Sequence, residues 1–261
     1  MQQPSFFIPH GGGPCFFMDD PRGIWTGMAA FLRSLPATLP ERPRAVLVVS
    51  GHWETDGFAF TGAEHPPLLY DYYNFPPHTY ELRYPAPGAP ELAGRAAGLL
   101  AGADIHASVD PQRGLDHGVF VPLKVALPDA DIPVVEMSVD RRLDPALHLA
   151  AGRALSVLRE EGVLILGSGM SFHNMRGYGD PRFTAPSQAF DGWLTDAVAQ
   201  DGAARAEALA RWEAAPAARL SHPEAEHLLP LMVVAGAAEG RGERVYSEQV
   251  LETAISGFRF H

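Results

Sequence analysis

The sequence contains very little cysteine, lysine or positive charge. Cys15 is the only cysteine among 261 residues, which excludes an intrachain disulfide and a metal site made of cysteines alone. Lys124 is the only lysine, and the formal net charge is −11 at pH 7. This charge argues against nucleic acid or an anionic membrane as a general partner, because both need clustered basic residues. A small anionic substrate stays open, since a few local arginines suffice to bind one.

The sequence also lacks long apolar stretches and a leader-like start. No apolar run approaches the roughly 20 residues that span a bilayer. The first four residues lack the basic and apolar segments of a secretion signal. The composition, with 46% hydrophobic and 20% charged residues, is ordinary for a globular protein. These features predict a cytoplasmic enzyme, and the length allows one large α/β domain or two smaller ones.

Short apolar strands alternate with helix-like segments along the chain. Strands are expected near residues 4–9, 44–50, 57–61, 132–139, 162–168 and 254–259. Helices are expected near residues 22–34, 90–102, 118–126, 144–160, 186–199, 202–213 and 222–237. The alternation predicts an α/β fold, a three-layer sandwich with a central mixed, mostly parallel sheet flanked by helices.

The segment 63–90 is dense in proline, tyrosine and histidine, and it is too long for a simple connection. Long loops in compact domains often carry function. The alternative is a proline-stiffened surface loop with aromatic packing. In the functional interpretation, Tyr72, Tyr73, His78 and Tyr80 shape a pocket.

Three histidines follow predicted buried strands. His10 opens a Gly-Gly-Gly-Pro turn after the first strand, His52 follows the second, and His173 comes after a strand and a glycine-rich turn. Ligands usually bind beyond the carboxyl ends of strands in open α/β sheets. Neutral imidazoles suit Fe(II), Zn(II), Cu(II) or Ni(II), and three protein ligands with open positions suit catalysis. The strand ends therefore predict a catalytic metal site, and ligand type alone does not select between iron and zinc.

His227 is expected one turn inside the helix at 222–237, which Pro223 would begin. There it shares a face with apolar neighbours and is either a satisfied core residue or a metal ligand. Glu224 or Glu226 could supply a carboxylate instead.

His117 lies between Asp116 and a glycine. Its imidazole could exchange protons near neutral pH in a pocket, or the segment could be a turn that Asp116 stabilises. The remaining histidines that lack a persuasive context are expected on the surface or in packing: His65, His106, His148, His222 and His261.

The glycines after His10 have two rival interpretations. The His-Gly-Gly-Gly segment is typical of an esterase oxyanion loop, but no Gly-x-Ser-x-Gly nucleophile motif accompanies it. A phosphate-binding loop would need a Lys-Ser/Thr pair or the Rossmann glycine spacing, and both are absent.

Six segments in one order resemble the class III extradiol ring-cleavage dioxygenases, in particular the DOPA-dioxygenase-like branch of the LigB superfamily. They are His-Gly-Gly-Gly-Pro, Ser-Gly-His-Trp, Tyr-Asp-Tyr-Tyr-Asn-Phe-Pro, Leu-Asp-His-Gly, Gly-Ser-Gly-Met-Ser-Phe-His-Asn and Glu-His-Leu-Leu-Pro-Leu. The resemblance runs from about residue 5 to 237, and it implies a single catalytic domain over residues 1–261.

The resemblance also implies roles for individual residues. His10, His52 and His227 would be metal ligands, and His173 would be an acid/base or an additional ligand. His117 would be a second catalytic histidine that contacts the substrate. Tyr72 and Asp116 are the other expected substrate-binding residues.

The leading hypothesis is a non-haem Fe(II) extradiol dioxygenase that cleaves a catechol-type substrate, DOPA-like or a catecholic acid, with O₂. Purified protein could carry Zn(II) instead. The alternatives are a zinc-dependent hydrolase and a non-enzymatic binding module on the same fold. The expected assembly is a monomer or a homodimer.

Overall fold

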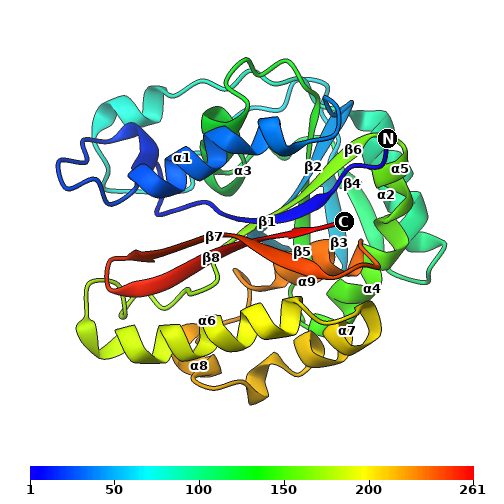
Figure 1. Cartoon of the computed structure of the whole chain (residues 1–261). Coiled ribbons are helices and arrows are strands. Elements are labelled where there is room, and N and C mark those ends of the chain that lie inside the picture. The colour runs from blue at the N-terminus through cyan, green and yellow to red at the C-terminus, as the bar shows by residue number, and fades with distance from the viewer.

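One eight-stranded mixed sheet crosses the molecule in the computed structural model, which describes residues 1–261, and helices cover both of its faces (Figure 1). The strand order is β4-β3-β5-β2-β6-β1-β8-β7. The strands are β1 Ser5–Pro9, β2 Ala45–Thr55, β3 Phe58–Thr61, β4 Ala107–Asp110, β5 Val134–Asp140, β6 Val163–Gly169, β7 Gly242–Val250 and β8 Thr253–Phe260.

The α-helices are α1 Thr26–Ser34, α2 Pro90–Ala101, α3 His117–Ala126, α4 Pro145–Leu155, α5 Val157–Glu160, α6 Thr184–Val198, α7 Gly202–Ala210, α8 Ala218–Ser221 and α9 Leu229–Gly236. Short 3₁₀ helices are η1 Cys15–Phe17, η2 Leu35–Thr38, η3 Pro77–Glu81, η4 Pro181–Phe183 and η5 Trp212–Ala214. None of the helices combines the length and the apolar character that a bilayer crossing needs.

The centre of the sheet is parallel. β2 pairs in parallel with β5 and β6, and β6 pairs in parallel with β1. The antiparallel pairs lie outside this centre: β3 pairs with β5, β8 with β1, and β7 with β8. The expected fold, a mixed and mostly parallel sheet between helical layers, is confirmed.

Alternating side chains divide the core into two layers, as the period of two in a strand requires. In β1, Phe7 belongs to one apolar cluster, whereas Phe6 and Ile8 belong to the other. The first cluster packs under α2, α4, α6, α7 and α9, and the second packs under α1 and α3. Because both faces are covered, the residues of β5 and β6 are buried throughout and most of them are apolar, which is typical of a parallel sheet.

Three expectations about elements were wrong or incomplete. The helix expected at 222–237 begins only at Leu229, after a run of bends and turns, so His227 lies before α9 and not one turn inside it. β2 continues through a register shift to Thr55, so His52 lies within the strand and not after it. The edge strands β4 and β7 were not expected, because their exposed polar residues weaken the apolar signal.

The segment 63–90 packs against α3 through aromatic side chains. Tyr70 lies edge-on to Phe120 of α3, with ring centroids 5.7 Å apart. The Tyr70 hydroxyl donates to the Leu82 carbonyl, and the Tyr72 hydroxyl donates to the Thr79 carbonyl, both at 2.6 Å. The loop is therefore stiffened by its own hydrogen bonds, and it presents one edge to the site described below.

His148 is a fully buried histidine of α4 with both ring nitrogens in use. The Asp140 N–H donates to its Nε2 at 3.1 Å, and its Nδ1 donates to the Asp144 carbonyl at 2.7 Å. Burial lowers the pKa of His148 from 6.5 to about 4. The unfolded chain therefore binds a proton at a higher pH than the folded chain does. The contribution of neutral His148 to the free energy of unfolding is fully present above pH 6.5, and it is lost as the pH drops toward 4.

We predict that His148→Gln lowers stability at pH 7 but makes its acid dependence shallower. The wild-type loss from this one group is up to about 1.4 kcal/mol per pH unit, which the variant would not show. Urea denaturation at pH values between 7 and 4 measures both effects. His65→Gln, at an exposed site, is the control. An unchanged pH slope in His148→Gln would contradict the prediction.

Candidate metal centre

The parallel centre of the sheet brings three histidines to one edge. His10 directly follows β1, His52 lies in the last part of β2, and His173 follows β6. In the sheet, β6 lies between β1 and β2. The His10 N–H donates to the Gly169 carbonyl at 3.2 Å, which ties the turn after β1 to the end of β6. These three histidines meet because parallel strands end at the same edge.

His117 and His227 join this edge from elements outside the sheet. His117 is the first residue of α3, and His227 lies in the turn before α9. Two glycines allow the close approach. A side chain at Gly118 would come within 2.8 Å of the His52 ring, and one at Gly169 would collide with the His227 carbonyl oxygen.

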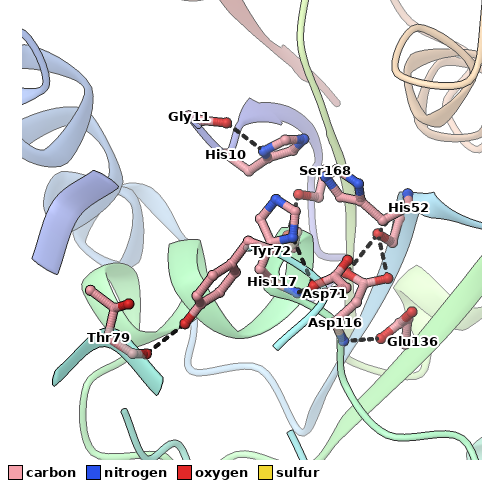
Figure 2. Close-up of polar contacts among 12 residues, drawn as sticks. His10, Gly11, His52, Asp71, Tyr72, Thr79, Asp116, His117, Glu136 and Ser168 are labelled. Carbon is pink, nitrogen blue, oxygen red and sulfur yellow. Dashed lines mark hydrogen bonds and ion pairs between the residues drawn. The ribbon is translucent and has the colours of Figure 1, made fainter. Parts of the chain in front are cut away.

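The five imidazoles form one continuous cluster. His10, His52 and His117 offer ligand atoms that lie within 4.8 Å of one another, as do His173, Glu226 and His227. The two triplets meet where the Nε2 atoms of His52 and His227 lie 3.3 Å apart. The His10 and His117 rings lie close together, with Tyr72 beside His117 (Figure 2).

The acceptors around the rings determine which nitrogen carries the proton. Nδ1 of His10 faces the Gly11 carbonyl at 2.8 Å, and Nδ1 of His117 faces Asp71 Oδ1 at 2.8 Å. Nδ1 of His173 and of His227 both face Glu226 Oε1, at 3.1 and 2.9 Å. Because an oxygen of this kind only accepts, each Nδ1 is the donor, and each neutral ring keeps its lone pair on Nε2.

The resulting donor set fits a metal ion. Nε2 of His10 is buried and has no hydrogen-bond partner within the protein. Nε2 of His227 carries a lone pair and faces Nε2 of His52 at 3.3 Å. A shared cation would satisfy these nitrogens, and histidine ligands of metals commonly donate their other N–H to a carboxylate or a carbonyl, as seen here.

Burial keeps the central rings neutral. Burial and then the charge of His52 lower the pKa of His10 well below its usual range, and burial and then His173 do the same for His227. Burial and then His117 lower the pKa of His52 to about 4. At neutral pH these three rings are therefore in the form that binds a metal.

Two carboxylates are oriented toward the outer edges of the cluster. Burial raises the pKa of Asp71, but the hydrogen bond and charge of His117 outweigh it, and the pKa is lowered overall. The same balance, with His173 as the partner, lowers the pKa of Glu226. Both groups are thus anions at neutral pH. Glu226 was considered as a carboxylate source from the sequence. The sequence predicted no role for Asp71. The signal that could have identified it was a single aspartate within a segment of aromatic residues.

Asp116 does not reach the cavity, which differs from the substrate contact expected from the sequence. It is fully buried and accepts a hydrogen bond from Ser50, with Oγ–carboxylate distances of 2.9 and 3.0 Å. Its N–H donates to Glu136 at 2.9 Å (Figure 2), and Arg113 lies 3.3 Å from its Oδ2. The Asp116 side chain turns toward β2, and it supports His52 through Ser50, which accepts the His52 N–H at 3.2 Å.

Glu136 is the second fully buried acid of this network, and sequence reasoning missed it. Burial and then the charge of Asp116 raise its pKa well above the usual range. The available signal was a glutamate inside a mainly apolar strand, because a charged residue at such a position needs a buried partner.

A cavity of about 420 Å³ adjoins the cluster. Its polar part includes His10, His52, His117, His173 and Asp71, and its walls include Trp25, Phe75 and Tyr178. His227 is only 4% exposed and lies beneath this surface.

Tyr72 contributes its ring to the cavity, because its hydroxyl points to Thr79 (Figure 2). Tyr73 also lines the cavity, whereas His78 and Tyr80 do not. The segment 63–90 therefore shapes the pocket in part, as the functional interpretation expected.

The other histidines lie away from the cluster, in agreement with the expectation of surface or packing positions. His148 and His222 are fully buried, and His65, His106 and His261 are exposed.

Comparisons with known proteins identify the family of this chain. The family described as the catalytic LigB subunit of aromatic ring-opening dioxygenase matches residues 5–258. Dioxygenase tasH of Hapsidospora irregularis is 40% identical, over 97% of this chain and 83% of that protein. The 4,5-DOPA dioxygenase extradiol of Beta vulgaris is 41% identical, over 90% of this chain and 86% of that protein.

Relatives from Escherichia coli extend the comparison. Its 4,5-DOPA dioxygenase extradiol is 36% identical, over 92% of this chain and 87% of that protein. The crystal structure of an uncharacterised protein from the same organism is similar with a TM-score of 0.79 and 30% identity, over 100% of both chains. The chain therefore belongs to the LigB family, in its DOPA-dioxygenase-like branch, and is an extradiol ring-cleavage dioxygenase.

Proposed function

We propose that this protein is a non-haem Fe(II) enzyme that uses O₂ to open the ring of a catechol-type substrate, DOPA-like or a catecholic acid. The observation that carries the proposal is the convergence of imidazole Nε2 atoms beside a cavity with aromatic walls. Neutral imidazoles suit Fe(II) by their softness, and Zn(II) is the alternative metal in purified protein. The name shared by several relatives, 4,5-DOPA dioxygenase extradiol, supports the substrate class.

His10, His52 and His227 would hold the metal in this proposal, and His173 is either an additional ligand or a proton carrier. The unpaired Nε2 of His10 and the facing Nε2 atoms of His52 and His227 support this ligand set. When bound, the metal would supply Lewis acidity toward the catechol oxygens and electron transfer with O₂.

His117 and His173 would be the catalytic residues that handle protons. Each keeps a lone pair on Nε2 and borders the cavity, so it can accept the proton of a substrate hydroxyl. The carboxylate behind each ring, Asp71 or Glu226, stabilises the imidazolium that this transfer forms.

The aromatic walls would bind and orient the substrate ring. Tyr72 presents its ring next to His117, with centroids 5.7 Å apart and planes at 83°. Aromatic pairs of this kind contribute about 0.5–1.5 kcal/mol beyond the area that they bury. The same side chains exclude water from the reacting atoms.

We also propose that residues 1–261 form one catalytic domain, which the single sheet supports. The cytoplasmic location and the choice between monomer and homodimer stay predictions.

We predict that anaerobic reconstitution with Fe(II), followed by admission of O₂, gives ring cleavage of at least one compound in a catechol panel. The panel should contain catechol, DOPA and catecholic acids, and the readouts are O₂ consumption and the yellow ring-opened product. The Zn(II) form is the control and is expected to be inactive. Activity that needs zinc and ignores oxygen would favour a hydrolase, and metal-loaded protein that cleaves no catechol would contradict the proposal.

We predict that His52→Ala and His227→Ala abolish metal binding, because each removes an Nε2 from the shared cluster. His173→Ala should keep the metal and lose turnover, since its expected role is proton transfer. Metal content after dialysis and turnover at saturating Fe(II) measure the two effects. His65→Ala, at an exposed site, is the control. Loss of metal from His173→Ala would show that His173 is a ligand.

A further inference from the structure

Glu226 joins two site histidines through a single oxygen atom. Its Oε1 lies 3.1 Å from Nδ1 of His173 and 2.9 Å from Nδ1 of His227. The two rings are stacked, with centroids 3.4 Å apart and planes at 17°. One carboxylate oxygen therefore faces the same edge of two parallel imidazoles.

The hydrogen bonds to Glu226 determine that the opposite edge of each ring presents a lone pair and not an N–H group. A carboxylate oxygen has two lone pairs, so it can accept both N–H groups at once. Each neutral ring has only one N–H, and placing it on Nδ1 leaves a lone pair on Nε2. The Nε2 atom of His227 then faces His52, and the His173 ring borders the cavity.

The turn that carries Glu226 is held by two strands of the sheet. A side chain at Gly51 of β2 would come within 2.9 Å of the Glu226 carbonyl oxygen. The Met170 N–H, just after β6, donates to the His227 carbonyl at 3.1 Å. The position of the carboxylate is thus set by the same strands that deliver His52 and His173.

Glu226 has no other polar partner that would explain its placement. Its second oxygen, Oε2, is buried and unpaired, and no arginine or lysine forms an ion pair with it. Its side chain is only 16% exposed. Both polar contacts of this largely buried carboxylate are with the two histidines.

We propose that Glu226 is a positioning residue that fixes the tautomer and orientation of His173 and His227 together. Its hydrogen bonds prepare His227 to bind the metal and aim Nε2 of His173 at the substrate. The expected effect on turnover rests on the proposed function. The expected effect on metal binding depends only on the imidazole nitrogens of the cluster.

Three substitutions separate hydrogen bonding from charge. Glu226→Gln keeps an oxygen that can accept both N–H groups, and its amide group takes the place of the unpaired Oε2. Glu226→Asp keeps the charge but is one methylene shorter, so it reaches the two rings poorly. Glu226→Ala removes the acceptor. Glu224→Ala removes an exposed carboxylate from the same turn and is the matched control.

Titration with Co(II), whose visible spectrum reports on ligand geometry, is the first measurement. We expect Glu226→Gln to bind Co(II) within a few-fold of the wild-type affinity and with the same spectrum. Glu226→Asp and Glu226→Ala should bind about 10–100-fold more weakly, the range expected for loss of a group that orients a metal ligand. Glu224→Ala should bind as the wild type does.

Turnover at saturating Fe(II) is the second measurement. Glu226→Ala should lower kcat while KM changes little, because a misaimed His173 impairs proton transfer more than substrate binding. Glu226→Gln should recover kcat in part, because it restores the aim of His173 but lacks the charge that stabilises its imidazolium. A general loss of structure would not be rescued in this way, and circular dichroism of each variant identifies such a loss.

Three results would overturn the inference. Wild-type Co(II) binding by Glu226→Ala would show that the hydrogen bonds do not matter. Tight binding by Glu226→Asp together with weak binding by Glu226→Gln would show that charge acts instead of geometry. Loss of the metal from every Glu226 variant, to the extent seen in His227→Ala, would show that Glu226 is itself a ligand. If wild-type protein binds Co(II) but cleaves no catechol, the proposed function fails and the order of affinities still tests Glu226.

Discussion

The parallel pairing of β1, β6 and β2 is the constraint on which the rest of the site depends. Pro9 lies beside Gly169, and Ser50 lies beside Ser168, so the three strand ends are in register at one edge. His10, His52 and His173 come from segments that are far apart in the sequence, and this register alone brings them together. The apolar layers on both faces of the sheet hold the register, because a slip by one residue would turn every side chain to the opposite face, where it would not fit the packing.

Burial of five imidazoles costs free energy, because their polar nitrogens lose hydrogen bonds to water. Acceptors on the outer edges of the rings offset this cost. The charged form of each buried ring is disfavoured by desolvation and by its neighbours, so the central rings stay neutral. A neutral ring still needs a partner for its N–H, and a carbonyl or carboxylate supplies one for four of the five rings. The same acceptors direct the lone pairs inward, so the packing that stabilises the fold also prepares the donor set.

The sequence predicted the sheet, most helices and the site histidines, because these have local signals. Apolar strands that end in histidine can be recognised one at a time, and so can the order of the six segments that resemble the LigB superfamily. The late helix was placed too early because Pro223 looks like a helix start, whereas the chain forms turns until Leu229. The edge strand β7 was missed because most of its residues are exposed, and only pairing with β8 holds it in the sheet.

By itself, the sequence determined which side chains could bind a metal and which strands would deliver them, because residue type and strand pattern are local properties. Only the tertiary structure decided the partners: Asp71 behind His117, Glu226 between His173 and His227, and Asp116 turned away from the cavity toward Ser50. Apart from the contact between Glu226 and its neighbour His227, these contacts join residues from separate elements, and their geometry depends on how the strands and turns pack. Spacing along the chain therefore does not encode them.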